Sequence, residues 1–392
     1  MLSNTKRVLV SLMSAPRKNI TLTLGRVILA VIQCIAARVA QLDALETTVF
    51  GRPLEAQPEV SVSPSGNSRG ENPDALQDRG LSLIASENAH LAEVELRRAW
   101  ELNPTEERYV RNLSSFYINN RRYDKAQEIV QDYTTRQGEN GLSCLLQGEV
   151  FFAQKEFAKA YQSLRRSLEF SSDNYRAHQL VGLIHVLAQR ELDALEELRL
   201  AAQQNPHSAQ TRFLLGRTYY RTGNYGQARD EFLACLKIQP SYPKATENLG
   251  LCFEALEEIS SATQAYERAI QLEKDGKTPP SEDPYVEYAL LLAKQADLRK
   301  SIGLLREGLR RNPKSARANF ELGRVLFKAE QITEAERYLL ASSILDPKFS
   351  RPHFFLGRIY LKMKRVKDAK MHFSLFQDLD KDIRNREARI TR

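Results

Sequence analysis

The stretch AQTRFLLGRTYYRTGNYGQARDEFLACLKIQPSY, residues 209–242, decides the fold of this chain. Gly216, Ala228 and Pro240 follow one another in it at intervals of twelve residues. The segment RTGNYGQA (221–228) is typical of a turn between two helices. Proline ends the second helix, because it has no amide hydrogen to donate and its ring clashes with the preceding turn. The stretch therefore predicts one helix-turn-helix unit.

The same pattern recurs along the chain with a period of 34 residues. A glycine is followed by an alanine twelve residues later, and in several places by a proline twelve residues after that. Such period-locked similarity predicts a solenoid of stacked units. The glycines are Gly80, Gly148, Gly182, Gly216, Gly250, Gly323 and Gly357, the alanines are Ala92, Ala160, Ala194, Ala228, Ala262, Ala335 and Ala369, and the prolines on the grid are Pro104, Pro206, Pro240, Pro313 and Pro347.

Small residues at fixed points have a packing reason. Glycine and alanine let the two helices of one unit approach closely, because a larger side chain would force the backbones apart. Aromatic residues at recurring positions, such as Tyr219, Phe232 and Tyr360, fill the space between neighbouring units.

These residues resemble the tetratricopeptide repeat (TPR) family, whose W-x2-L-G-x2-Y, A-x3-F and P pattern is nearly complete in 209–242. Two units match weakly, since Ser114 replaces one glycine and Ala289 and Ser301 replace another glycine and its alanine. The resemblance implies an all-α, right-handed superhelical solenoid of about nine helix-turn-helix repeats. We place the repeats at 73–106, 107–140, 141–174, 175–208, 209–242, 243–276, 282–315, 316–349 and 350–383, with an insertion at 277–281.

The resemblance also implies a concave groove lined by the first helix of each repeat. It places the second, fifth, ninth, twelfth and thirteenth residues of a repeat on that surface. The eighth and ninth repeats have basic residues in three shared slots and phenylalanine in a fourth, as a surface for carboxylates would need. The predicted partner-binding residues are Arg217, Tyr220, Arg221, Lys244, Arg317, Phe320, Arg324, Phe327, Lys328, Arg351, Phe354, Arg358 and Lys362.

Other slots are apolar in the first, third and fourth repeats, among them Leu81, Leu145, Phe152 and Leu183. Two interpretations stay open for them: burial inside a tightly wound array, or a hydrophobic peptide groove or dimer contact.

Charge is spread unevenly. The net charge is +8 over 392 residues, and residues 282–392 alone contain 24 basic and 15 acidic residues. We therefore expect a non-catalytic scaffold that binds an acidic protein or peptide along its groove. The alternatives are binding of nucleic acid or another anionic polymer by the basic C-terminal repeats, which is less expected, and a role as accessory subunit of an envelope enzyme or secretion assembly.

Motifs for catalysis, metals and cofactors are missing from the sequence, which has no phosphate loop, HExxH, GxSxG or CxxC. We expect no enzyme activity, no cofactor, no metal and no small-molecule substrate. His178 and His185, seven residues apart, are expected to be core histidines. The four cysteines are expected to be free thiols, and Cys235 with Cys252 is the one pair that sequence spacing leaves as a possible disulfide.

The N-terminal segment has no acidic residue before Asp43 and contains the apolar run VILAVIQCIAA (27–37). A basic start before a short apolar run predicts a signal peptide or a membrane or targeting segment at 1–40. We expect export, periplasmic or extracellular, or membrane tethering through this segment alone, with a cytoplasmic location as the alternative. Residues 41–72 are expected to be a flexible linker, and 384–392 a basic cap on the last helix.

Overall fold

In the computed structural model, the described residues 72–276 and 280–390 form 18 α-helices and no β-strand. The predictions for the leader, for the linker up to residue 71 and for most of the 277–281 insertion lie outside these residues. The predicted C-terminal cap falls on the end of helix α20, although its side chains and residues 391–392 are not described. The prediction of an all-α chain of about nine helix-turn-helix repeats is confirmed.

The described residues divide into two compact units, one up to Ile184 and one from His185 onward, which are described separately. In the first unit the paired helices are α3 (Pro73–Ala85), α4 (Ala89–Leu102), α5 (Glu107–Asn119), α6 (Tyr123–Gln137), α7 (Gly141–Ala153) and α8 (Phe157–Phe170). Helix α9 (Tyr175–Leu187) contains the boundary between the units.

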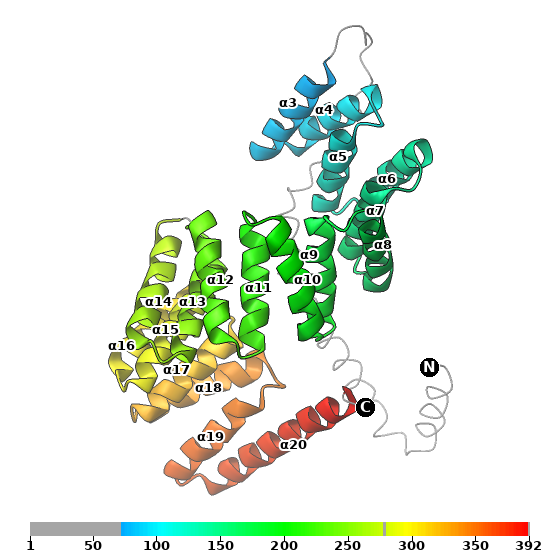
Figure 1. Cartoon of the computed structure of the whole chain (residues 1–392). Coiled ribbons are helices and arrows are strands. Elements are labelled where there is room, and N and C mark those ends of the chain that lie inside the picture. Colours follow the sequence, from blue (N-terminus) through cyan, green and yellow to red (C-terminus); the bar gives the residue numbers. More distant parts are fainter. Residues whose placement is uncertain (1–71, 277–279, 391–392) are drawn as a thin grey trace, which may run out of the picture. The chain divides into compact units, whose positions relative to one another are not determined.

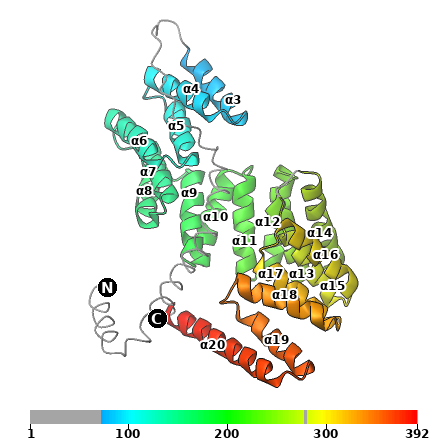
Figure 2. The ribbon, with the colours of Figure 1, turned by 180° about the vertical axis from the view of Figure 1, so that it is seen from behind.

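The second unit contains the groove residues predicted from the sequence. Successive odd-numbered helices from α11 to α19 contact one another, so they form one layer, and each packs against the even-numbered helix that follows it. Figures 1 and 2 show these pairs from opposite sides. The helices are α10 (Glu191–Gln204), α11 (Ala209–Arg221), α12 (Tyr225–Ile238), α13 (Pro243–Ala255), α14 (Ile259–Lys274), α15 (Asp283–Lys294), α16 (Leu298–Arg311), α17 (Ala316–Lys328), α18 (Ile332–Leu345), α19 (Ser350–Lys362) and α20 (Val366–Ile390).

The recurring glycines lie where two helices of a pair come closest. A Cβ atom added to Gly80, Gly148, Gly216, Gly250, Gly323 or Gly357 would lie 2.5–2.8 Å from a large side chain sixteen residues later. The recurring alanines are 0% exposed. In the weak seventh repeat, the Ser301 hydroxyl donates a 2.7 Å hydrogen bond to the carbonyl of Ala289. The helix pair therefore forms there without the glycine and alanine.

Each turn inside a repeat contains one residue with a left-handed backbone, always seven positions after the glycine slot. Only one of these nine residues, Gly223, is a glycine. Left-handed φ is unfavourable for residues with a Cβ atom, so this repeated conformation is set by the helix pair that it joins. The others are Glu87, Arg121, Lys155, Gln189, Glu257, Ala296, Glu330 and Lys364, with φ between 58° and 67°.

The two histidines expected in the core are buried, and so are most of the apolar slot residues named above. His178 and His185 are 7% and 5% exposed. Leu145, Phe152 and Leu183 are buried, whereas Leu81 is 41% exposed. Within the part of the chain that the structure describes, Cys144, Cys235 and Cys252 are free thiols, and burial raises the pKa of each.

Candidate functional site

A hollow of about 550 Å³ lies on the inner layer of the second unit. Helices α11, α13, α15, α17 and α19 all contribute to its lining, which combines apolar and charged side chains. Hollows of this size suit a small ligand or a short peptide segment. Its lining residues are Tyr220, Leu251, Glu254, Ala255, Glu287, Leu290, Ala293, Lys294, Glu321, Arg324, Lys328 and Arg351.

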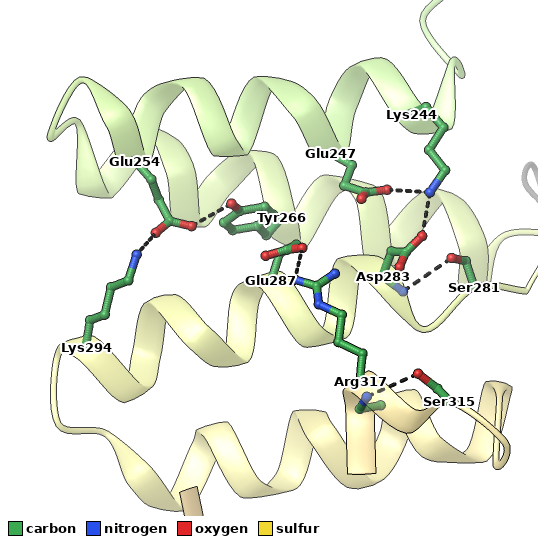
Figure 3. A network of polar contacts seen from close by, with 11 residues as sticks. Lys244, Glu247, Glu254, Tyr266, Ser281, Asp283, Glu287, Lys294, Ser315 and Arg317 are labelled. Atoms are coloured by element: carbon green, nitrogen blue, oxygen red, sulfur yellow. Dashed lines mark hydrogen bonds and ion pairs between the residues drawn. The ribbon is translucent and has the colours of Figure 1, made fainter. Parts of the chain in front are cut away.

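Ion pairs join neighbouring repeats beside this hollow, as Figure 3 shows. Lys244 on α13 contacts Asp283 on α15 at 2.5 Å and Glu247 on its own helix at 3.1 Å. Arg317 on α17 donates to Glu287 on α15 at 2.6 Å. Because the Lys244–Asp283 and Arg317–Glu287 pairs each link two repeats, they hold these helices in one geometry.

A second set of contacts surrounds Glu254 on α13. Its carboxylate accepts hydrogen bonds from the Tyr266 hydroxyl at 2.6 Å and from the Lys294 ammonium at 2.7 Å. Tyr266 is fully buried, so this carboxylate connects the core to the groove surface.

Two carboxyl groups in the groove have raised pKa values. Burial raises the pKa of Glu247 to about 7, against the opposing effect of Lys244. Burial also raises the pKa of Glu287, against the opposing effect of Arg317. Both groups are therefore protonated more readily than an exposed glutamate.

Raising the pH is expected to make Glu247 destabilise the second unit. The pKa of its carboxyl is about 7 in the folded protein, against an ordinary value of 4.5. Between these values the folded state binds more protons than the unfolded state, so the free energy of unfolding falls as pH rises. Between about pH 5 and about pH 8 this carboxyl should lower the free energy of unfolding by on the order of 2 kcal/mol, as measured by urea unfolding. Glu247→Gln stays neutral and should therefore remove this fall.

Comparing the wild-type protein with Glu247→Gln separates the effect of this carboxyl on stability from the effects of other titrating groups. Burial lowers the pKa of both His353 and His372, whose Nδ1 atoms lie 2.9 Å apart. Their effect has the opposite sign, since stability rises with pH when a base titrates at a lower pH in the folded state. Both histidines are present in both proteins, so parallel stability curves would contradict the prediction for Glu247.

Most of the predicted groove cations are paired inside the protein. Arg324 contacts Glu321 at 2.7 Å, and the Lys328 ammonium donates to the Ala293 carbonyl at 2.9 Å. Lys362 pairs with Glu330, and Arg221 pairs with Glu191. With Lys244 and Arg317 above, the groove has a mixed charge rather than a continuous basic face.

Three predicted arginines have no ion pair among the described residues. Arg217 lies over the Phe213 ring at 5.7 Å, Arg351 over Phe320 at 4.7 Å, and Arg358 over Phe327 at 4.9 Å. The surrounding groove walls reduce hydration around Arg217 and lower its pKa, and nearby Arg221 lowers it further.

The predicted aromatic residues fall into two groups, and this corrects the interpretation of two of them. Phe320 is 0% exposed and Phe327 is 8% exposed, so their rings support arginines and do not face a partner. Phe354 is 37% exposed, and Tyr220 lines the hollow. The reason is that the fifth and twelfth slots of the eighth repeat are covered by the ninth.

The groove carboxylates were missed by the sequence analysis. Glu254 and Glu247 lie in the twelfth and fifth slots of the sixth repeat, and Asp283 in the second slot of the seventh. The slot pattern used for the basic repeats would have found them, had it been applied to all positions of these two repeats. Glu287 and Glu321 lie outside the five slots, and only the structure places them in the hollow.

Residues 72–276 and 280–390 lack two features. They contain no group of three or more histidine, cysteine or acidic side chains able to hold a metal ion. They also contain no helix with the length and apolar character that a membrane span requires.

Comparison with known proteins agrees with this fold. The tetratricopeptide repeat family model matches residues 213–277 and 289–348. The Cut9–Hcn1 hetero-tetramer of the APC/C has a similar structure, with a TM-score of 0.56 and 16% identity, covering 73% of this chain and 58% of that one. The matched residues are therefore tetratricopeptide repeats, and the helix pairs of the chain have the fold of such repeats.

Two curated proteins are similar over half of the chain. BBSome complex member BBS4 from Bos taurus is 24% identical over 197 residues, which are 50% of this chain. Stress-induced-phosphoprotein 1 from Caenorhabditis elegans is 24% identical over 206 residues, which are 51% of this chain. The matches span 37% and 62% of the length of these two relatives.

Proposed function

We propose that this chain is a non-catalytic scaffold for protein–protein interactions, and that it binds a peptide segment of a partner in the groove of its second unit. The observation that carries the proposal is the 550 Å³ hollow, to which five successive inner helices contribute. Its apolar lining residues Leu251 and Leu290 offer contact area, while fixed charges beside them orient a ligand. The tetratricopeptide repeats at 213–277 and 289–348 and the printed association of Cut9 with Hcn1 and of BBS4 with the BBSome support a scaffold role.

A partner with acidic groups remains part of the proposal, in a narrower form than the sequence indicated. The paired cations are already neutralised by the protein's own carboxylates, so Arg217, Arg351 and Arg358 are the ones available for an anionic ligand. Export or membrane tethering through residues 1–40 is also a proposal, and it rests on the sequence alone.

Substituting Leu290→Arg is expected to reduce partner capture at least about tenfold, because the long cation fills the hollow and displaces apolar contacts. The measurement is affinity capture or proximity labelling with the full chain, quantified by mass spectrometry. Ile344→Arg is the matched control, since Ile344 is 76% exposed on the even-numbered helix α18. Equal capture by both variants, with equal melting temperatures, would contradict a groove function.

Salt dependence separates this proposal from binding of an anionic polymer. A polymer that contacts many cations releases many counterions, so the logarithm of affinity falls steeply with the logarithm of salt concentration. A short peptide held by apolar contacts and a few arginines is expected to show a shallow slope. A steep slope for a captured nucleic acid would favour the alternative function.

A further inference from the structure

Helix α19 presents two arginines in the same structural setting. Arg351 lies over the ring of Phe320, and Arg358 lies over the ring of Phe327. The two arginines are seven residues apart on α19, and the two phenylalanines are seven residues apart on α17. Each ring is buried, so each guanidinium rests on a fixed support.

These arginines differ from the other cations of the same wall. Arg317 and Arg324 are ion-paired with Glu287 and Glu321. Among the described residues Arg351 and Arg358 have no such pair, and both are exposed. Stacking on an aromatic face restrains a guanidinium while leaving its N–H groups free for a planar anion. The pair is therefore prepared for a ligand with two carboxylates.

The helix geometry gives the distance between the two positions. Seven residues at about 1.5 Å each separate the arginines by about 10 Å along α19, and they lie on one face because seven residues are nearly two turns. Arg351 also lines the hollow, so a ligand in the hollow reaches the first of the two arginines.

We propose, resting on the proposed function, that the groove selects a partner segment in an extended, polyproline-like conformation with acidic side chains at positions i and i+3. Such a segment advances about 3.1 Å per residue with three residues per turn, so these side chains share a face and lie about 9 Å apart.

The test uses the full chain and fluorescein-labelled, proline-rich peptides that contain two glutamates separated by one to seven positions, read by fluorescence anisotropy. We expect the i, i+3 peptide to bind about tenfold more tightly than the i, i+2 and i, i+4 peptides. Arg351→Gln/Arg358→Gln is expected to weaken this binding about thirtyfold and to remove the spacing preference. Arg299→Gln/Arg337→Gln removes the same charge from exposed positions on α16 and α18 and is expected to change affinity less than about twofold.

Each outcome decides between the two proposals. Binding without a spacing preference, a maximum at i, i+7, or equal losses in both double variants would overturn the paired-arginine inference and leave the groove function in place. Failure of every peptide to bind, while Leu290→Arg still abolishes partner capture, would also overturn the inference alone. Failure of the peptides together with capture that Leu290→Arg does not reduce would overturn both.

Discussion

Phe320→Ala is expected to lower the free energy of unfolding of the second unit by about 4 kcal/mol, because it removes a large, fully buried ring. Phe320 is 0% exposed, and its ring contacts Phe349 at 4.9 Å and Phe355 at 5.7 Å between centroids. The substitution leaves a cavity between α17 and α19 and also removes the support of Arg351. Urea unfolding, with hydrogen exchange read on α17 and α19, measures both effects.

Phe354→Ala is the control for this prediction. Phe354 lies on α19, where its ring contacts Phe373 and Phe376 of α20, and is 37% exposed, so its removal is expected to cost only about 1–2 kcal/mol. If Phe320 instead contacted a partner directly, Phe320→Ala would leave stability unchanged and reduce binding alone. That result would contradict the packing described here.

Gly250→Val is expected to destabilise the second unit by about 3 kcal/mol through overpacking. A Cβ atom at Gly250 would lie 2.5 Å from the Tyr266 ring, which is 0% exposed and is hydrogen-bonded to Glu254. The ring has no space into which to move, so α13 and α14 must separate. Loss of protection in these two helices by hydrogen exchange, together with a lower melting temperature, is the expected result.

Gly303→Ala provides a control of opposite sign. Gly303 lies inside α16, is exposed, and has no atom within 4 Å of an added Cβ. Alanine has a higher helix propensity than glycine, so the substitution is expected to stabilise the unit by about 0.5–1 kcal/mol. Destabilisation by both substitutions would show that glycine matters for some reason other than close helix packing.

The fold was predictable because small residues recur along the sequence with the period of the repeat. Gly216 and Ala228 are small because the two helices of one pair pack closely at these positions, and this requirement is local to the pair. The weak seventh repeat also contains a helix pair, α15 and α16, in which the Ser301 hydroxyl donates to the Ala289 carbonyl in place of the usual glycine–alanine contact. Local rules of this kind transfer from one repeat to the next.

The charge pattern of the groove was not predictable to the same degree. Slot positions identified Arg317 and Arg324 as groove residues, but their partners Glu287 and Glu321 lie outside those slots. Whether a cation is free depends on side chains from neighbouring helices, and this is a property of the packed array. The burial of Phe320 has the same origin, since Phe355 of the next repeat packs against its ring.

The left-handed residue in each turn has a consequence for how this scaffold can change. A non-glycine residue in that conformation is strained by about 1 kcal/mol, and eight of the nine turns described here have one. Seven of these eight side chains are exposed, and none of the eight lines the hollow. The Glu330 carboxylate pairs with Lys362 of the next repeat. Substitutions at the turns can therefore change the melting temperature, while substitutions on the inner helices change the ligand. Stability and specificity can evolve at separate sets of positions.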